Sequence, residues 1–191
     1  MTATPTAAPQ SAAPLNANRP PSARAKAAMI RVNHAGEFGA QRIYAGQRAI
    51  LGDNAPGARE VEHMAQQEQR HFDWFDAAIT RRQVRPTLLQ PFWHVAGFTL
   101  GAVTAALGPE AAMACTAAVE TEIDRHYSEQ LEQLGDSDPE LSAAIADFQA
   151  EELEHKATAL AHGAEGAPAY PLLSGLIRLG CRAAIAVTKR I

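Results

Sequence analysis

The sequence is organised around one stretch, Phe148-Gln149-Ala150-Glu151-Glu152-Leu153-Glu154-His155. A second stretch, Gln67-Glu68-Gln69-Arg70-His71, repeats its pattern of a Glu followed three residues later by a His. On an α-helix two such residues lie on one face, about 4.5 Å apart along the axis. The carboxylate and the imidazole then point the same way and can bind the same metal.

Each of these motifs is paired with a single Glu upstream. Glu37 precedes Glu68 by 31 residues and Glu120 precedes Glu152 by 32 residues, with the turn signals 52–57 and 135–139 between them. Residues equidistant from the turn of an antiparallel helical hairpin lie at the same height. Two hairpins packed together therefore place four carboxylates and two imidazoles at one level, the ligand set typical of ferritin-like di-iron or di-manganese proteins.

Periodic apolar residues and Pro or Gly signals predict the helices. The bundle helices are expected over 27–51, 56–83, 109–134 and 139–162, and two additional apolar helices over 88–107 and 170–187. The predicted fold is all-α, a ferritin-like four-helix bundle of two hairpins with two extra helices. Gly36 and Gly39 flank Glu37, which indicates either close backbone approach or crowding at the metals, or simply small residues for helix packing.

The composition of the first 26 residues differs from that of the rest of the chain. Five prolines within the first 21 residues predict an Ala/Pro-rich, disordered tail over 1–26, followed by one domain over 27–191. An organelle transit peptide is the alternative, because this segment has no acidic residue.

The two apolar segments allow two interpretations. No formally charged residue occurs from Leu88 to Leu107, and residues 170–187 combine leucines and isoleucines with Arg178 and Arg182. Both can rest on a membrane surface. The alternative for both is ordinary packing against the bundle.

Charge and cysteine content exclude other classes. The formal net charge of −4 argues against a nucleic-acid binder. Cys115 and Cys181 form neither a disulfide framework nor a zinc motif. Carboxylate and histidine ligands favour iron or manganese.

Several Glu and His residues near the predicted ligands are not expected to bind the metal. Glu60 and His63 form another Glu-x-x-His, but they lie too close to the turn to reach the height of Glu37. Glu151 and Glu154 are expected to point away from the site, because only Glu152 is three residues before His155.

Other groups near the expected centre have less certain roles. His126 and Tyr127 lie one to two turns beyond Glu120, where they could carry protons or place a substrate, or could simply be a surface histidine and a core tyrosine. His34 could support the site from behind, since metal-bound histidines need a partner for the second ring nitrogen.

Several motifs together resemble the demethoxyubiquinone hydroxylase family of ubiquinone biosynthesis. They are Arg31-Val32-Asn33-His34-Ala35-Gly36-Glu37-Phe38-Gly39-Ala40, Arg42-Ile43-Tyr44-Ala45-Gly46, Arg85-Pro86-Thr87, Ala112-Met113-Ala114-Cys115-Thr116 through Val119-Glu120, Glu151-Glu152-Leu153-Glu154-His155 and Ala167-Pro168-Ala169-Tyr170. The resemblance implies six metal ligands, the set that spacing also selects: Glu37, Glu68, His71, Glu120, Glu152 and His155. It places the family's His-Tyr pair on His126 and Tyr127.

The resemblance also implies a function. It is that of a di-iron monooxygenase that uses O2 to hydroxylate the ring of a polyprenyl benzoquinone, with NADH as the electron source. Such an enzyme is expected on a membrane surface, on the cytoplasmic face of a bacterial inner membrane or on the matrix side of the mitochondrial one. A homo-oligomer or partner proteins of ubiquinone biosynthesis are further expectations. The alternatives are a ferritin-like ferroxidase and a non-enzymatic helical module at a membrane.

Overall fold

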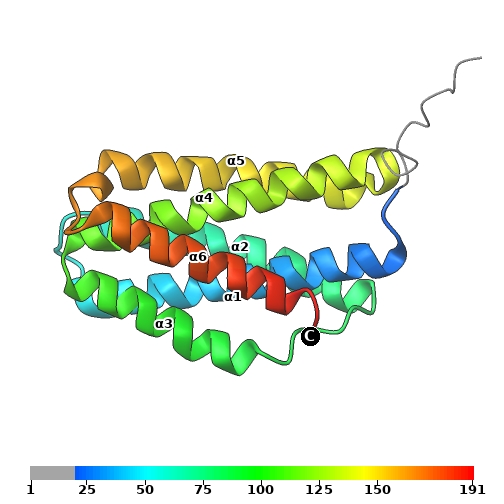
Figure 1. Ribbon diagram of the computed structural model, residues 1–191, viewed down its shortest axis with the longest axis horizontal. Coiled ribbons are helices and arrows are strands. Elements are labelled where there is room, and N and C mark those ends of the chain that lie inside the picture. Colours follow the sequence, from blue (N-terminus) through cyan, green and yellow to red (C-terminus); the bar gives the residue numbers. More distant parts are fainter. Residues whose placement is uncertain (1–19) are drawn as a thin grey trace, which may run out of the picture.

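The computed structural model describes residues 20–191, which form an all-α bundle (Figure 1). Its α-helices are α1 (Ala23–Leu51), α2 (Ala58–Arg81), α3 (Gln90–Ala106), α4 (Pro109–Leu134), α5 (Pro139–Ala161) and α6 (Tyr170–Thr188), with short 3-10 turns at Gly135–Ser137 and Ala164–Gly166. The described residues contain no strand. The prediction of an all-α bundle is therefore confirmed.

Two hairpins form the centre of the molecule. α1 packs along α2, and α4 packs along α5, as the turn signals predict. α3 lies mainly against α1 and α6 mainly against α4, so these two additional helices cover one side of the bundle (Figure 1). Among the described residues, no further helix covers the side formed by α2 and α5.

The starts of α1, α2 and α3 differ from the prediction, and α3 begins at Gln90 rather than residue 88. α1 begins at Ala23 rather than residue 27, because the Ser22 side chain accepts a hydrogen bond from the Ala25 N–H and caps the helix. α2 begins at Ala58 rather than residue 56, because Gly57 adopts a left-handed conformation with φ of 79° and so cannot belong to the helix. The part of the expected tail before residue 20 lies outside the described residues.

α3 and α1 approach one another through glycines. A Cβ built on Gly101 would lie 1.9 Å from the Ile43 carbonyl oxygen, and one built on Gly46 would lie 2.2 Å from the Phe98 carbonyl oxygen. Gly97 similarly faces the carbonyl of Gly39. Among the atoms that the structure describes, none outside the local helix backbone lies within 4 Å of the Cβ position of Gly36 or of Gly39, so the close approach depends on Gly46, Gly97 and Gly101 rather than on the two glycines that flank Glu37.

Three apolar clusters surround the middle of the bundle. One contains Phe75, Leu141, Ile145 and Phe148, and an alanine-rich one lies at the opposite end around Met64. The third joins Ile43, Cys115 and Ile177 beneath α3 and α6. Both cysteines are free, as their positions in the sequence indicate. Polar side chains buried between these clusters are shielded from water.

Candidate metal centre

Six buried side chains meet halfway along the bundle. They form two overlapping groups, each with ligand atoms within 4.8 Å of one another: Glu37, Glu68, His71 and Glu152 in the first, and Glu68, Glu120, Glu152 and His155 in the second. Glu68 and Glu152 belong to both groups. This arrangement suits two metal ions with two bridging carboxylates, and one further carboxylate and one imidazole for each ion.

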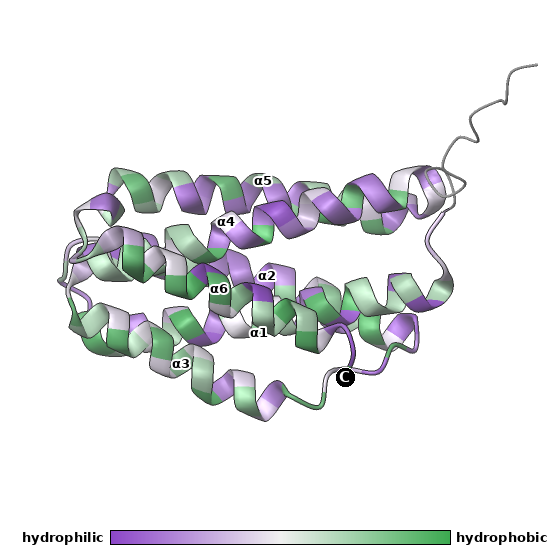
Figure 2. Ribbon diagram, viewed as in Figure 1, coloured by the Kyte–Doolittle hydropathy of each residue, from purple (hydrophilic) through white to green (hydrophobic). Residues whose placement is uncertain are grey.

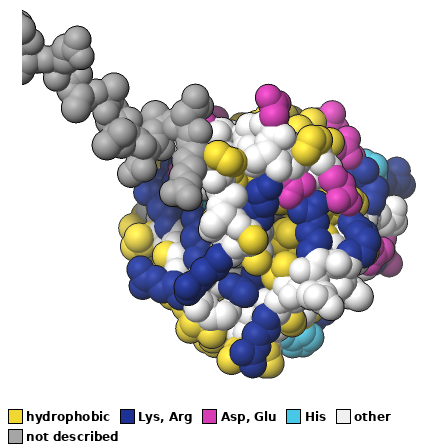
Figure 3. All heavy atoms as spheres, turned by 90° about the vertical axis from the view of Figure 1, so that its right-hand side faces the viewer, with side chains coloured by type: hydrophobic (Ala, Val, Ile, Leu, Met, Phe, Trp, Pro, Cys, Tyr) yellow, Lys and Arg dark blue, Asp and Glu magenta, His cyan; other side chains and the backbone are white. Residues whose placement is uncertain are grey.

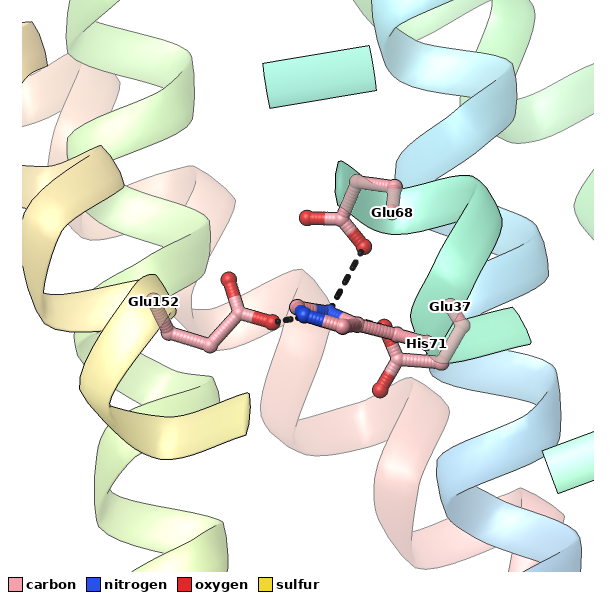
Figure 4. Close-up of side chains that lie close together, drawn as sticks. All are labelled: Glu37, Glu68, His71 and Glu152. Carbon is pink, nitrogen blue, oxygen red and sulfur yellow. Dashed lines mark ion pairs between the residues drawn. The ribbon is translucent and has the colours of Figure 1, made fainter. Parts of the chain in front are cut away.

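The first group is drawn in Figure 4, where Glu68, Glu37 and Glu152 surround the ring of His71. The Nδ1 atom of His71 lies 3.1 Å from Glu152 Oε1, 3.5 Å from Glu37 Oε2 and 3.8 Å from Glu68 Oε2. In the second group, His155 Nδ1 lies 3.1 Å from Glu152 Oε2 and 3.4 Å from Glu68 Oε1. Both imidazoles therefore present the same nitrogen to the carboxylates.

The carboxylates lack enough partners of their own. Within residues 20–191, at least one buried oxygen of each has no hydrogen-bond partner: Glu37 Oε2, both oxygens of Glu68, Glu120 Oε2 and Glu152 Oε1. A buried carboxylate oxygen without a partner is costly, and bound cations would satisfy these atoms. The donor set therefore fits a pair of divalent cations that prefer oxygen and imidazole ligands.

The charges of the site perturb one another. Burial and the neighbouring carboxylates raise the pKa of Glu68 and of Glu120 well above the ordinary value. Burial lowers the pKa of His71, but Glu152 and Glu37 outweigh it and raise this pKa to about 10. The protein thus crowds negative charge where cations would lie.

Two tyrosines cross between the hairpins in matching ways. The Tyr127 hydroxyl donates to Glu37 Oε1, and the Tyr44 hydroxyl donates to Glu120 Oε1 at 3.1 Å. Burial raises the pKa of both phenols well above 10, so they stay donors. Tyr44 was not among the expected site residues, although it follows Glu37 by seven residues as Tyr127 follows Glu120.

The structure separates the expected His-Tyr pair. The buried His126 ring accepts a hydrogen bond of 2.6 Å from the Gln130 side-chain amide, and Gln130 exchanges two further bonds with Asn33. Burial lowers the pKa of His126 to about 4, so the ring is neutral at neutral pH. His126 precedes Tyr127 by one residue and therefore points about 100° away from it, toward this amide pair rather than toward the carboxylates.

The second nitrogens of the two histidines have partners that the sequence analysis missed. His71 Nε2 lies 2.9 Å from Glu151 Oε2, and His155 Nε2 lies 3.0 Å from Gln67 Oε1. The expectation that Glu151 points away is corrected: it points away from His155 but reaches the histidine of the other hairpin. His34 instead lies 3.3 Å from Asp76 and does not support the site.

The excluded motif lies beside the centre. Glu60 and His63 belong to neither group of ligands, as predicted from their height. They line a cleft of about 320 Å³ between α2 and α5, whose walls also include Gln67, Glu154 and His155. Glu122 is buried outside the centre and binds Arg125, Arg178 and Arg182.

Comparison with known proteins agrees with these motifs. The profile of the family described as "Ubiquinone biosynthesis protein COQ7" matches residues 24–188. The chain is 51% identical over 162 residues to "3-demethoxyubiquinol 3-hydroxylase" of Rhodospirillum rubrum, covering 85% of this chain and 76% of that protein.

Eukaryotic relatives are similar as well. The mouse (Mus musculus) protein "NADPH-dependent 3-demethoxyubiquinone 3-hydroxylase, mitochondrial" is 51% identical over 166 residues, covering 85% of this chain and 76% of that protein. "5-demethoxyubiquinone hydroxylase, mitochondrial" of Saccharomyces cerevisiae is 41% identical over 179 residues, covering 85% and 77% respectively. The family resemblance seen in the motifs is therefore confirmed, and this chain belongs to the COQ7 family of ubiquinone biosynthesis proteins.

Proposed function

We propose that this chain is a di-iron monooxygenase that hydroxylates the ring of demethoxyubiquinone during ubiquinone biosynthesis. The observation that carries the proposal is the pair of four-ligand groups sharing Glu68 and Glu152. Membership of a family whose relatives are named hydroxylases favours this reaction over the ferroxidase alternative. In the proposed reaction one atom of O2 enters a ring C–H bond and the other leaves as water.

Two electrons and protons must come from a reductant. The mouse relative is named NADPH-dependent, whereas NADH was the coenzyme that the sequence resemblance implied. We propose a reduced nicotinamide as the source and leave the choice between the two coenzymes to assay. When bound, the two irons would supply the redox chemistry that activates O2.

The protein's own residues orient and shield this chemistry. Glu37 and Glu120 would each hold one metal, with the direction of each carboxylate fixed by a tyrosine of the opposite hairpin. Tyr127 is the proposed proton-handling group, because its hydroxyl bonds Glu37 directly. His126 is proposed to act only indirectly, by bonding Gln130 and thus bracing α4 against Asn33 of α1.

An apolar substrate is proposed to reach the site between α1 and α4. A packing gap there, too narrow to hold a water molecule, is lined by Ala40, Ile43, Tyr44, Thr116, Val119 and Glu120. It lies on the side that α3 and α6 cover. A typical ligand pocket holds about 300 Å³, so a quinone ring would enter only with movement of the covering helices.

We also propose that α3 and α6 rest on a membrane. Eleven of the fourteen exposed large apolar side chains in the described residues lie in the segments 88–107 and 172–191. Figure 2 shows these hydrophobic residues along both helices. α6 is long and apolar enough to cross a bilayer by length and composition alone, but it lies along the bundle with only 11% of its apolar window buried.

Basic side chains accompany this apolar side. Figure 3 shows Lys and Arg gathered at the end of the molecule where α6 terminates, and Lys189 and Arg190 are exposed there. Anionic lipid would attract them. The cytoplasmic face of a bacterial membrane and the matrix side of a mitochondrial one remain the two proposed locations, and the mouse and yeast relatives are named mitochondrial.

The reaction can be tested with purified protein. Protein loaded anaerobically with two equivalents of Fe²⁺ should convert demethoxyubiquinone when NADH or NADPH and ¹⁸O₂ are supplied, and mass spectrometry should find one ¹⁸O atom in the product. The variant Glu152→Ala should bind less iron and form no product, because it removes a carboxylate shared by both groups. Product formation by a metal-free protein would contradict the proposal.

Membrane docking is tested separately. Phe92 and Leu176 are 59% and 60% exposed, so replacing both with Asp should abolish sedimentation with liposomes that contain anionic lipid, without changing iron content. Replacing Leu153 and Leu160, which are exposed on α5, serves as the matched control and should change neither property. Unaltered liposome binding by the Phe92/Leu176 variant would show that α3 and α6 are ordinary packing.

A further inference from the structure

The two halves of the metal centre are related by an internal repeat. Gln67 directly precedes Glu68, and Glu151 directly precedes Glu152. Each of these two residues reaches across to the histidine of the other hairpin, at 3.0 Å for Gln67 to His155 and 2.9 Å for Glu151 to His71. Both residues therefore bond the outer nitrogen of a histidine, but Gln67 does so with a neutral amide and Glu151 with a carboxylate.

The carboxylate partner is itself held in place. Arg70 donates to the other oxygen of Glu151 and also to Asp147 at 3.0 Å. The Glu151 side chain is 22% exposed, and the ring of Phe148 lies 4.2 Å from that of His71 between ring centroids. The outer side of His71 is therefore closed by an ordered, charged network.

The amide partner faces a different environment. Gln67 and His155 both line the 320 Å³ cleft between α2 and α5, together with Arg59, Glu60, His63 and Glu154. The residue equivalent to Arg70 in the repeat is Glu154, which is exposed, and in the part of the chain that the structure describes no guanidinium is hydrogen-bonded to Gln67 as Arg70 is to Glu151. The outer nitrogen of His155 is therefore hydrogen-bonded to an uncharged side chain, and this side of the ring borders a polar cleft.

These differences affect how strongly each imidazole binds a cation. A carboxylate that accepts the outer N–H of a histidine raises the basicity of the ring and fixes its orientation, and losing such a partner typically costs about 10–100-fold in metal affinity. A neutral amide fixes the orientation but adds no charge. The cleft also brings water and ions close to His155.

We infer that the two metal positions are unequal: the position at His71 holds its divalent cation tightly, whereas the position at His155 is labile and exchanges its cation through the polar cleft between α2 and α5. This inference rests on the proposed di-metal site and deepens it. Cation exchange then takes place on the side opposite α3 and α6, so it does not compete with an apolar substrate for the same path.

The affinities can be measured without turnover. Mn²⁺ titrated into the intact apo-protein, with free Mn²⁺ read by electron paramagnetic resonance, should bind in two steps that differ about 10–100-fold. Glu151→Gln should weaken the tight step until the two steps become alike. Gln67→Glu should strengthen the weak step. Asp147→Asn, which removes the other partner of Arg70 but leaves Glu151 on His71, is the matched control and should leave both steps unchanged.

The location of each step needs a second readout. With ¹⁵N-histidine protein and one equivalent of Zn²⁺, the ring signals of His71 should shift before those of His155. Release of Mn²⁺ to a chelator should show one fast and one slow phase, and His63→Trp, which fills the cleft, should slow the fast phase alone.

The outcomes separate the inference from the function. Two equal steps in the wild-type protein, or unequal steps that neither Glu151→Gln nor Gln67→Glu alters, would overturn the inference while leaving the di-metal site intact. A folded wild-type protein that binds no divalent cation would instead refute the proposed centre. If Glu151→Gln fails to fold, as judged by its circular dichroism, Gln67→Glu decides alone, because unchanged weak binding and unchanged fast release in that variant would refute the inference.

Discussion

The variant Glu122→Gln tests what holds α6 against the bundle. Glu122 lies on α4 and its side chain is fully buried. It accepts three hydrogen bonds from α6, one from Arg178 Nε at 2.8 Å and two from Arg182 at 2.8 and 2.9 Å. The two guanidiniums belong to the segment 170–187, for which the sequence allowed either a membrane surface or packing against the bundle, and in the structure they bond this carboxylate.

The magnitude follows from the number and exposure of these bonds. Buried bonds to a charged group contribute about 1.5–3 kcal/mol each. The Arg178 and Arg182 side chains are 40% and 50% exposed, so water replaces much of each lost bond and about 0.5–1 kcal/mol apiece is a better figure. Removing the charge should therefore weaken α6 docking by about 2 kcal/mol, which is roughly 30-fold in the equilibrium constant for opening.

Hydrogen exchange measured by mass spectrometry reads this opening directly. In Glu122→Gln, amides of α6 should exchange about 30-fold faster while those of α2 and α5 keep their protection. Glu129→Gln is the matched control, because Glu129 lies on the same helix and bonds Arg125 but not α6. Equal protection of α6 in the wild-type and the Glu122→Gln protein would refute the reasoning and assign α6 docking to apolar contacts alone.

Three further predictions concern single groups. Tyr127→Phe should keep two metals bound but slow turnover, and Tyr44→Phe should do the same, because its hydroxyl donates to Glu120 as that of Tyr127 donates to Glu37. Metal analysis and single-turnover kinetics check both, and unchanged rates would show that the two hydroxyls serve only packing. Gly101→Ala should lower the free energy of unfolding by about 1–3 kcal/mol in urea titrations, because its Cβ would meet backbone atoms, whereas Gly175→Ala, with open space around it, should not. Asp138 has its pKa lowered by Arg82, so the stability that it adds is present above the ordinary value of 3.8 and disappears as the pH falls through the depressed pKa. Asn can still cap α5, so Asp138→Asn removes only the charge; it should cost about 1 kcal/mol at pH 7 and progressively less as the pH falls below 3.8, and an equal cost at pH 7 and at low pH would contradict this.

Sequence predicts the bundle well because hairpin geometry is local. Turn signals, helical periodicity and the matched spacing of Glu37 with Glu68 each depend on residues within one hairpin. Helix starts were less accurate, since the beginning of α2 depends on the left-handed conformation of Gly57. Gly57 belongs to the turn signal 52–57, but such a signal does not indicate at which residue the next helix begins.

Most contacts between the two hairpins could not be predicted from the sequence. The partners of the histidines, Gln67 and Glu151, cross from one hairpin to the other, and spacing within a single hairpin says nothing about such contacts. The burial of Glu122 arises only because α6 folds back along α4. Tyr44 is the exception, because it follows Glu37 by the same seven residues by which Tyr127 follows Glu120. Aligning the two hairpins with one another would have predicted its position in the site.

The glycine contact between α1 and α3 has a mechanical consequence. Where the backbones of α1 and α3 are in contact, as at Gly101 and Ile43, the two helices move together as one rigid unit. α6 is instead attached to α4 through longer side chains that can bend. Any tilt that a lipid surface imposes on α3 is therefore transmitted to α1 and so to Glu37. The proposed lipid-facing side thus has a rigid half, formed by α3, and a flexible half, formed by α6. The packing gap beside Glu120 lies between these two halves.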